Sequence, residues 1–279
     1  MKRSISNNES PTLSRMRSAM LDIALDSLHG HGFFSMAALC GHAAAEVAHG
    51  SPLFPGHLEF SLLERDGRFD LAPFMKKLSS DFTAYGLDVS VSLKRKRSPA
   101  VLAPILGTPP HGIKAEIRVP GEPSLALALS LETSPSPLFS LLDPCLDRSK
   151  RFSCIPLPGF FAWNVCSLLS RHAADKGFAR YWFHLSWCVE NGVELPLDCL
   201  LHLLLHKGVV LEPWSAGKVV REKLHVQVCK LDLNALFSDM ILNGALPERT
   251  REWSPEYFSG IVDSMKVTAA WQSPCRPDE

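Results

Sequence analysis

His57 and Glu59 are the residues of this chain whose types and spacing most plainly suggest chemistry. They alternate with Leu58, Phe60 and Leu62, and a period of two is typical of a strand with one buried and one exposed row of side chains. Residues i and i+2 of a strand project side by side, so ligands at this spacing can bind one metal ion. We therefore predict a metal site that includes His57 and Glu59.

Glu116 is the candidate for a third ligand. It lies in the alternating segment 112–119, where it shares a face with Lys114 and Arg118 and the apolar residues occupy the other face. A carboxylate on a strand beside Glu59 would complete such a metal site. Glu116 is predicted to take this place; the alternative is a salt-bridged carboxylate on an exposed sheet face.

The segments before the first strand must position its ligands. Gly41 and His42 form a turn, a short helix follows, and a loop with Pro and Gly residues leads into the strand 57–63. An apolar run at 33–39 is expected to be a strand or helix end packed beneath the turn. Further periodic segments predict a helix from Pro11 to Gly30, a helix at 71–84, a strand at 87–93 and a strand or helix at 125–131.

A change of pattern near residue 150 indicates two domains. The region 134–150 is rich in turn-forming residues, and the segments after it have the spacing of helices. The predicted helices cover 160–171, 173–190, 196–206, 212–228, 232–242 and 254–265. The expected fold class is therefore α+β: a mixed sheet with helices at 10–150, followed by an all-helical domain at 151–279.

Composition limits the function classes. The chain has 279 residues, of which 46% are hydrophobic and 21% charged, so it can form a substantial core. Its 29 basic and 29 acidic side chains cancel, so no net charge attracts it to nucleic acid or to an anionic membrane. The eight cysteines lack a C-x-x-C pair, which favours buried thiols in a reducing cytoplasm over disulfides or a zinc site. No signal peptide and no membrane span are predicted.

The order of these features resembles the AbiEii/AbiGii-type nucleotidyltransferases, the toxins of type IV abortive-infection systems. The family's leading motif is similar to G-G-T…R-x-S-x-D-L-D-F, and a V-K-I-E/D-I strand carries its third acid. The corresponding residues here are Gly41-His42-Ala43, His57-Leu58-Glu59-Phe60 and Ile113-Lys114-Ala115-Glu116-Ile117. The resemblance, which extends from the first helix to Met265, implies a polymerase-beta-like fold whose turn binds triphosphate oxygens and whose acids bind Mg²⁺ during in-line attack.

The helical half carries the second part of the resemblance. The family pattern there is similar to K-L-x-A-L-x-x-R followed by K-x-R-D-x-Y-D-L, which corresponds to 164–171 and 176–185. Three cations match and are implied, together with Gly41 and His42, to bind the nucleotide: Arg171, Lys176 and Arg180. The expected lysine is Asn164, and the two expected aspartates are Tyr181 and His184.

The departures from the family pattern fall on polar positions, whereas the apolar positions fit. One function that follows is a nucleotide-binding or regulatory pseudoenzyme with impaired or lost NMP transfer. The alternative is an active toxin that uses an NTP and Mg²⁺ or Mn²⁺ to modify a tRNA or protein acceptor, with Glu59 and Glu116 catalytic. The resemblance also implies an antitoxin partner. An unrelated function on a similar fold is the third interpretation.

Four other patterns could also bear on function. A softer ion such as Mn²⁺ tolerates nitrogen, so His57, Glu59 and Glu116 could together bind one. Glu64 and Asp66 could form a displaced acidic pair, although a solvated turn is the simpler interpretation. The basic run 94–97 is a solvated turn or a phosphate clamp. His202 and His206 are four residues apart without a matched acid, and the chain has no G-x-x-x-x-G-K-S/T, G-x-G-x-x-G or G-x-S-x-G motif.

Overall fold

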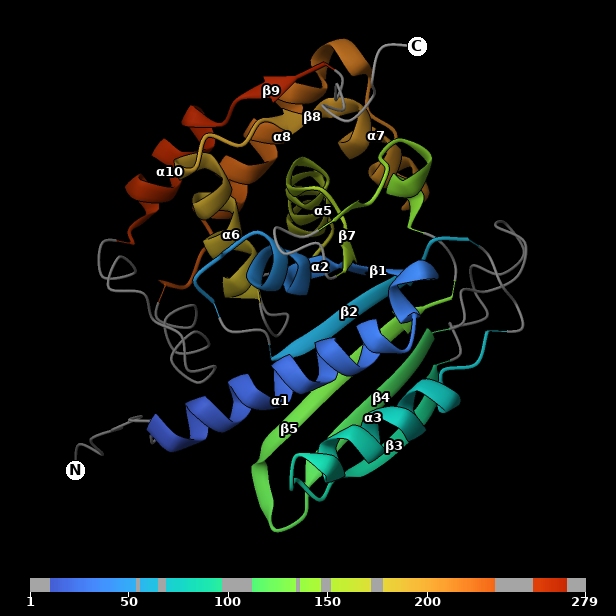
Figure 1. The fold of residues 1–279 in the computed structure, drawn as a ribbon. Helices are drawn as coiled ribbons and strands as arrows, with labels where there is room; N and C mark the ends of the chain where they lie inside the picture. Colours follow the sequence, from blue (N-terminus) through green and yellow to red (C-terminus); the bar gives the residue numbers. More distant parts are fainter. Residues whose placement is uncertain are drawn as a thin grey trace, which may run out of the picture. The chain divides into compact units, whose positions relative to one another are not determined.

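The chain, described here from a computed structural model, divides into two compact units (Figure 1). The first unit comprises Met1–Ala44, Pro55–Phe139 and Pro144–Ile155, and the second comprises Ala45–Phe54, Ser140–Asp143 and Pro156–Glu279. The structure describes residues 11–53, 56–64, 69–96, 112–133, 136–146, 152–171, 178–233 and 253–269. The main change of unit falls after residue 155, and the short segment 45–54 joins the second unit.

The first unit contains a seven-stranded mixed sheet with the order β3-β4-β5-β2-β1-β7-β6. Its strands are β1 (Ala37–Cys40), β2 (His57–Leu62), β3 (Ser90–Lys96), β4 (Gly112–Val119), β5 (Glu122–Glu132), β6 (Cys145–Leu146) and β7 (Ser153–Cys154). β2 is parallel to β5 and β1 is parallel to β7, whereas the other neighbouring pairs are antiparallel.

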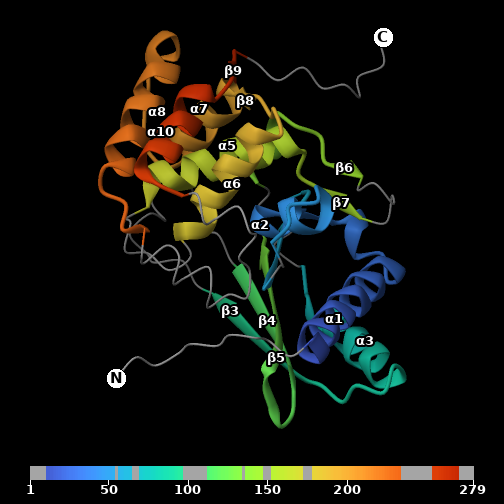
Figure 2. The ribbon, with the colours of Figure 1, turned by 90° about the vertical axis from the view of Figure 1, so that its left-hand side faces the viewer.

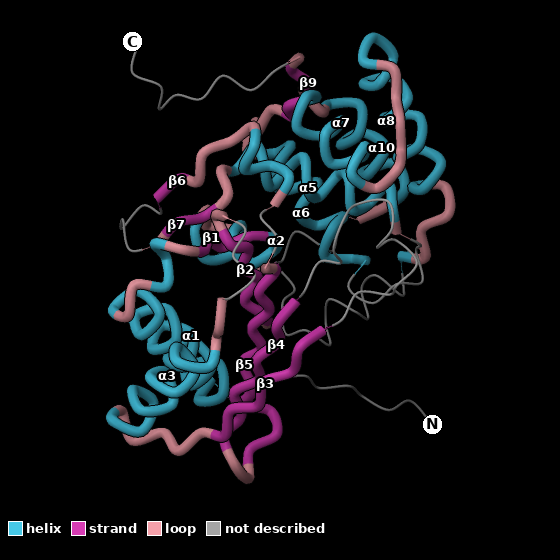
Figure 3. The backbone as a smooth tube through the Cα atoms, turned by 90° about the vertical axis from the view of Figure 1, so that its right-hand side faces the viewer, coloured by secondary structure: helices cyan, strands magenta, loops and turns pink. Residues whose placement is uncertain are grey.

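Two helices cover one face of this sheet. α1 (Pro11–Gly30) and α3 (Ala72–Ala84) lie side by side against it (Figures 1 and 3). The covered face carries the buried apolar row of the central strands: Leu58, Phe60, Leu62, Ile113, Ala115, Ile117, Leu127, Leu129 and Leu131. Between sheet and helices, the Phe33 ring in η1 (Phe33–Ser35) meets the rings of Phe60 and Phe74 at centroid distances of 5.0 and 5.3 Å. Burial of this apolar surface anchors the sheet and leaves its polar row on the opposite face.

The predicted elements of this unit are confirmed at several boundaries. α1 begins at Pro11 and ends at Gly30, and β2 and β4 occupy the segments where alternation was found. β3 continues to Lys96, so the first three residues of the basic run 94–97 belong to a strand and not to a turn. Arg97 and Asp66 lie outside the described residues.

The second unit is built mainly of helices (Figure 2). They are α5 (Leu157–Ser170), α6 (Phe178–Glu190), α7 (Leu197–His206), α8 (Pro213–Val228) and α10 (Pro255–Ser264). Its core includes Trp182, whose ring lies 5.2 Å from that of Phe258. Ser254 caps α10 by accepting a hydrogen bond from the Tyr257 backbone N–H, as the Ser-Pro pair predicts.

The predicted α+β class is confirmed, with one addition. Besides its helices, the second unit has a parallel pair of two-residue strands, β8 (Leu195–Pro196) and β9 (Val267–Thr268), so it is not entirely helical. The helix predicted at 232–242 falls almost wholly outside the described residues. Within the described part of the chain, no helix has the length and apolarity needed to cross a bilayer.

Candidate functional site

The turn after β1 holds the carboxylate of Glu59. Gly41 follows the strand with a φ of 59° and begins the short helix α2 (Gly41–Ala43). The backbone N–H of His42 donates a hydrogen bond to Glu59 Oε2 over 2.9 Å. A Cβ at position 41 would overlap the Glu59 carboxylate, whose Cδ would lie 2.6 Å away. Glycine is therefore required both for the backbone conformation and for this close approach.

His57 and Glu59 lie side by side on β2, as the alternation predicts. Both side chains are half-buried on the polar face of the sheet. Glu59 pairs in register with Cys40 on β1 and with Ser130 on β5, and His57 pairs with Ala128 on β5. The position directly beside Glu59 on β5 is therefore a hydroxyl group and not an acid. The ligand roles of His57 and Glu59 stay predictions.

The prediction that Glu116 lies on a strand beside Glu59 is wrong. β4, which carries Glu116, pairs with β3 and β5, and β5 separates it from β2. The registers place His57, Ala128 and Glu116 in one row across three strands. Neighbouring strands are about 4.8 Å apart, so the backbone of Glu116 lies roughly 10 Å from that of His57.

Glu116 and Glu59 share a sheet face but bind different partners. The Glu116 carboxylate accepts a hydrogen bond of 2.7 Å from Arg118 Nη2, and this ion pair is largely exposed. Glu59 binds the turn after β1, on the side of β2 that is opposite to β4. Glu116 thus makes the contacts that the alternative interpretation predicts, those of a salt-bridged carboxylate on an exposed sheet face.

Glu132 is an acid on the strand next to β2 that the sequence reasoning missed. It ends β5, pairs in register with Ser61 and faces the same side as Glu59. Burial raises the pKa of the neighbouring Cys40 thiol, and the charges of Glu59 and Glu132 raise it further, so this sulfur stays protonated. Glu132 could have been found as the residue that continues the polar row of the predicted strand at 125–131.

In the second unit, Arg180 forms a buried ion pair with Glu46. Glu46 lies in a π-helical turn, η2 (Ala44–Ala48), and its side chain is only 1% exposed. Nε and Nη2 of Arg180 both lie 2.6 Å from Glu46 Oε1. The charge of the predicted phosphate ligand Arg180 is therefore compensated within the protein.

His184 and Ser51 complete this cluster. His184 Nε2 lies 3.1 Å from Ser51 Oγ and 3.4 Å from Glu46 Oε1. A serine nucleophile with a histidine base would need the carboxylate on the other ring nitrogen, Nδ1, whereas here both partners meet Nε2. The cluster therefore does not have the geometry of a hydrolase triad, and its buried position indicates a structural role.

The buried His184 is expected to make the second unit less stable in acid. Burial lowers the pKa of His184 well below 6.5, and the charge of Arg180 lowers it further. Below about pH 6.5 the unfolded chain binds a proton that the folded ring does not, so this stabilisation is complete above that pH and is lost as the pH falls. We expect His184 to lower the free energy of unfolding by up to ~1.4 kcal/mol per pH unit from about pH 6.5 to 5.

Tryptophan fluorescence during urea unfolding measures this slope, because all six tryptophans belong to the second unit. In His184→Gln a side-chain amide nitrogen, which does not titrate, takes the place of Nε2. The free energy of unfolding of this variant should therefore depend less steeply on pH than that of the wild type. Equal slopes in the two proteins would contradict the assignment.

The remaining predicted nucleotide ligands are placed as follows. The guanidinium carbon of Arg171 lies 4.9 Å from the centroid of the Tyr181 ring, a cation–π contact. Asn164, at the expected lysine position, is buried and donates a hydrogen bond of 2.9 Å to the Tyr181 carbonyl. Lys176 lies outside the described residues. The polar residues that replace the family pattern here thus make contacts within the unit.

These observations define an α+β protein with a mixed sheet whose polar face presents Glu59 to a glycine turn. Among solved structures, the chain is similar to the crystal structure of a candidate nucleotidyltransferase from H. pylori, with 11% identity, 91% of this chain and 92% of that chain covered, and a TM-score of 0.49. It is also similar to JHP933 from Helicobacter pylori, with 10% identity, coverage of 91% and 89%, and a TM-score of 0.45. No family model and no curated protein matches the chain.

Proposed function

We propose that this chain is a nucleotidyltransferase-like pseudoenzyme, which binds a nucleotide or a regulatory partner and has impaired or lost NMP transfer. The observation that carries the proposal is the hydrogen bond from the His42 N–H to Glu59. In the family that the motifs resemble, this turn binds triphosphate oxygens and the strand acids bind metal. Here the Glu59 carboxylate occupies the turn. The backbone N–H that would bind a phosphate and the carboxylate that would bind a metal ion are therefore bonded to each other.

The donor set around Glu59 supports the loss of transfer. Mg²⁺ prefers oxygen ligands in octahedral geometry, and a two-metal mechanism uses carboxylates that bridge the ions. The residues beside Glu59 are His57 on its own strand, Cys40 on β1 and Ser130 on β5. These residues do not fit a site for a pair of Mg²⁺ ions.

The experiment that tests the proposal combines transfer and binding. Incubation with labelled NTPs, Mg²⁺ or Mn²⁺ and a cell extract should give no labelled tRNA or protein above the level of a Glu59→Ala/Glu116→Ala variant. In equilibrium binding without extract, Glu59→Ala should bind NTP about tenfold more tightly than the wild type, because it frees the His42 N–H and removes a repelling charge.

Glu132→Ala is the matched control, since it removes the same charge from the same sheet face and leaves the hydrogen bond at the turn in place. It should change NTP affinity much less than Glu59→Ala. Labelling above the double variant would overturn the loss of transfer, and a lack of NTP binding in all three proteins would overturn nucleotide binding.

The second candidate is an active nucleotidyltransferase toxin that modifies a tRNA or protein acceptor and is neutralised by an antitoxin. Glu132 favours it, because this acid lies on the strand next to β2 and on the face of Glu59. In that case a bound Mg²⁺ or Mn²⁺ would use Glu59 as a ligand. Glu59→Ala would then weaken metal-dependent NTP binding, whereas the pseudoenzyme is expected to bind NTP more tightly after this change.

A further inference from the structure

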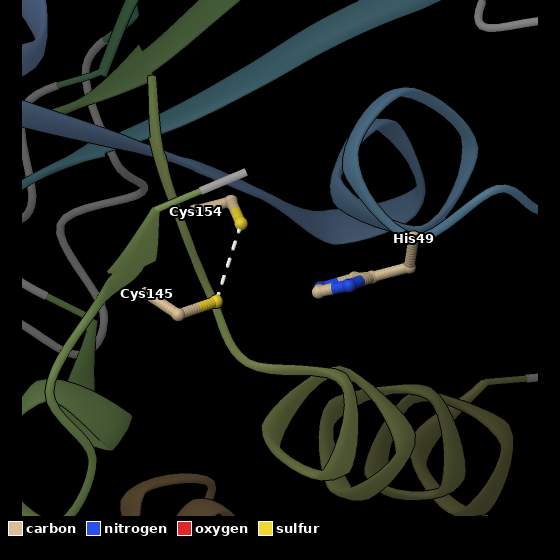
Figure 4. A group of neighbouring side chains, drawn as sticks. All are labelled: His49, Cys145 and Cys154. Carbon is tan, nitrogen blue, oxygen red and sulfur yellow. Dashed lines mark hydrogen bonds between the residues drawn. The ribbon is translucent and has the colours of Figure 1, made fainter. Parts of the chain in front are cut away.

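Cys145 and Cys154 face each other at the edge of the sheet in the first unit. They are register partners in the antiparallel pair of β6 and β7. Their Sγ atoms are 3.4 Å apart and within hydrogen-bonding distance (Figure 4).

The backbone geometry is suited to a disulfide. Directly opposed residues of an antiparallel pair have Cα atoms about 4.5 or 5.5 Å apart, and disulfides require about 4.4–6.8 Å. A disulfide bond is about 2.05 Å long, so the sulfurs need to approach by little more than 1 Å, a change that side-chain rotation can supply. The two thiols can therefore be joined without moving the strands apart or changing their register.

We propose that Cys145 and Cys154 are a redox modification site, at which a peroxide forms a reversible intramolecular disulfide. Cys145 is the more exposed of the two, whereas Cys154 is fully buried, so Cys145 is the sulfur that meets the oxidant. This pairing is independent of whether the chain transfers or binds nucleotides.

The reaction balances with hydrogen peroxide as the oxidant. The Cys145 thiol loses its proton and the thiolate attacks one peroxide oxygen; the O–O bond breaks, a sulfenic acid forms, and the other oxygen leaves as hydroxide, which takes up the released proton and becomes water. The Cys154 sulfur then attacks the Cys145 sulfur; the S–O bond breaks, the S–S bond forms and a second water leaves with the Cys154 proton. The two sulfurs together lose two electrons to the peroxide, and a dithiol such as dithiothreitol reverses the step by exchange.

The disulfide would fix the edge of the sheet beside the glycine turn. β7 pairs with β1 through Cys154 and Leu39, and β1 ends at Cys40 directly before Gly41. Closing the loop between β6 and β7 restricts the unfolded chain, so the oxidised protein should melt a few degrees higher than the reduced protein.

The test treats the full-length protein with hydrogen peroxide and maps the thiols. We expect two thiols to be lost, and a cross-linked pair of tryptic peptides that dithiothreitol separates. Trypsin cuts after Arg148, Lys150 and Arg151, between the two cysteines. Cys166 shares a tryptic peptide with Cys154, so fragmentation spectra must place the bond on Cys154.

Two variants provide the controls. Cys145→Ser removes the partner at a half-buried position and should abolish the cross-linked peptide. Cys229→Ser removes an exposed thiol that has no predicted role and should leave the cross-linked peptide unchanged. The proposal is overturned if wild-type Cys145 and Cys154 stay reduced under conditions that oxidise Cys229, or if Cys145 cross-links to another cysteine. The wild-type map decides this even where a variant folds poorly.

Discussion

Gly41→Ala is expected to lower the free energy of unfolding of the first unit by about 3 kcal/mol. Two costs add at this position. The φ of 59° lies in the left-handed region, where a side chain costs about 1–2 kcal/mol. The new Cβ would also overlap the Glu59 carboxylate and displace it from the His42 N–H, which adds the cost of overpacking and of a lost charge-assisted hydrogen bond.

Gly32→Ala separates these two costs. Gly32 has a φ of 74° in the same unit, and among the described residues no atom beyond its chain neighbours lies within 4 Å of its Cβ position. This variant should therefore show only the backbone cost of about 1–2 kcal/mol. Hydrogen exchange of the β1 and β2 amides measures the first unit, while tryptophan fluorescence, which reports only the second unit, should hardly change.

A double-mutant cycle with Glu59→Ala tests the cause. The overlap disappears when the carboxylate is removed, so Gly41→Ala/Glu59→Ala should be less destabilised than the sum of the single variants by about 1–2 kcal/mol. If the two losses are additive, or if Gly41→Ala costs no more than Gly32→Ala, Glu59 does not occupy the turn in solution. The proposed pseudoenzyme would then lose its main support.

Local elements of the fold could be predicted because their sequence pattern matches one buried face. Alternation identified β2 and β4 closely, since each presents one row to α1 and α3 and the other row to the polar face. The serine and proline before α10 identified its first turn, because capping depends on neighbouring residues alone. These signals lie within a few residues of the structure that they specify.

The order of strands could not be predicted in the same way. β5 lies between β4 and β2 because it forms an antiparallel pair with β4 and a parallel pair with β2. The turn at Gly121 indicates the first pairing, but no local residue indicates the second, whose partners are about 70 positions apart along the chain. The error about Glu116 therefore came from placing the strand at 112–119 beside the strand at 57–63 on the family resemblance, although no residue of either segment specifies that pairing.

The ion pair of Glu46 was missed for a related reason. Glu46 follows three alanines in an apolar segment, and a lone acid there indicates a buried charge that needs a partner. Arg180, which provides that partner, is 134 positions later in the chain. Sequence reasoning could flag the acid, but it assigned the arginine to phosphate because the family resemblance supplied the only available role.

Arg180→Met should lower the free energy of unfolding of the second unit by about 3–5 kcal/mol. The Glu46 side chain is 1% exposed and that of Arg180 is 22% exposed, so the variant would leave a buried carboxylate without its guanidinium partner. His184 lies beside Glu46, but burial holds its pKa well below 6.5 in the wild type, so Arg180 is the cation that compensates Glu46 there. Urea unfolding followed by tryptophan fluorescence measures the loss.

Arg118→Met is the control, because it removes the same kind of side chain from an exposed ion pair. Arg118 and Glu116 are 61% and 36% exposed, so this change should cost less than about 1 kcal/mol. Arg118 belongs to the first unit, so hydrogen exchange of the β4 amides measures this cost. Similar losses in the free energy of unfolding for Arg180→Met and Arg118→Met would show that burial does not increase the contribution of the Glu46–Arg180 pair to stability.

The double variant Glu46→Gln/Arg180→Met distinguishes a structural arginine from a phosphate ligand. It removes both charges, while the new side-chain amide at position 46 retains an oxygen toward His184, so it should recover a large part of the stability lost in Arg180→Met. A folded double variant can then be tested for NTP binding. Unchanged affinity would mean that Arg180 serves the buried cluster alone. A strong loss of NTP affinity would show that Arg180 binds the nucleotide, because a guanidinium that binds phosphate contributes to affinity whether or not Glu46 is charged.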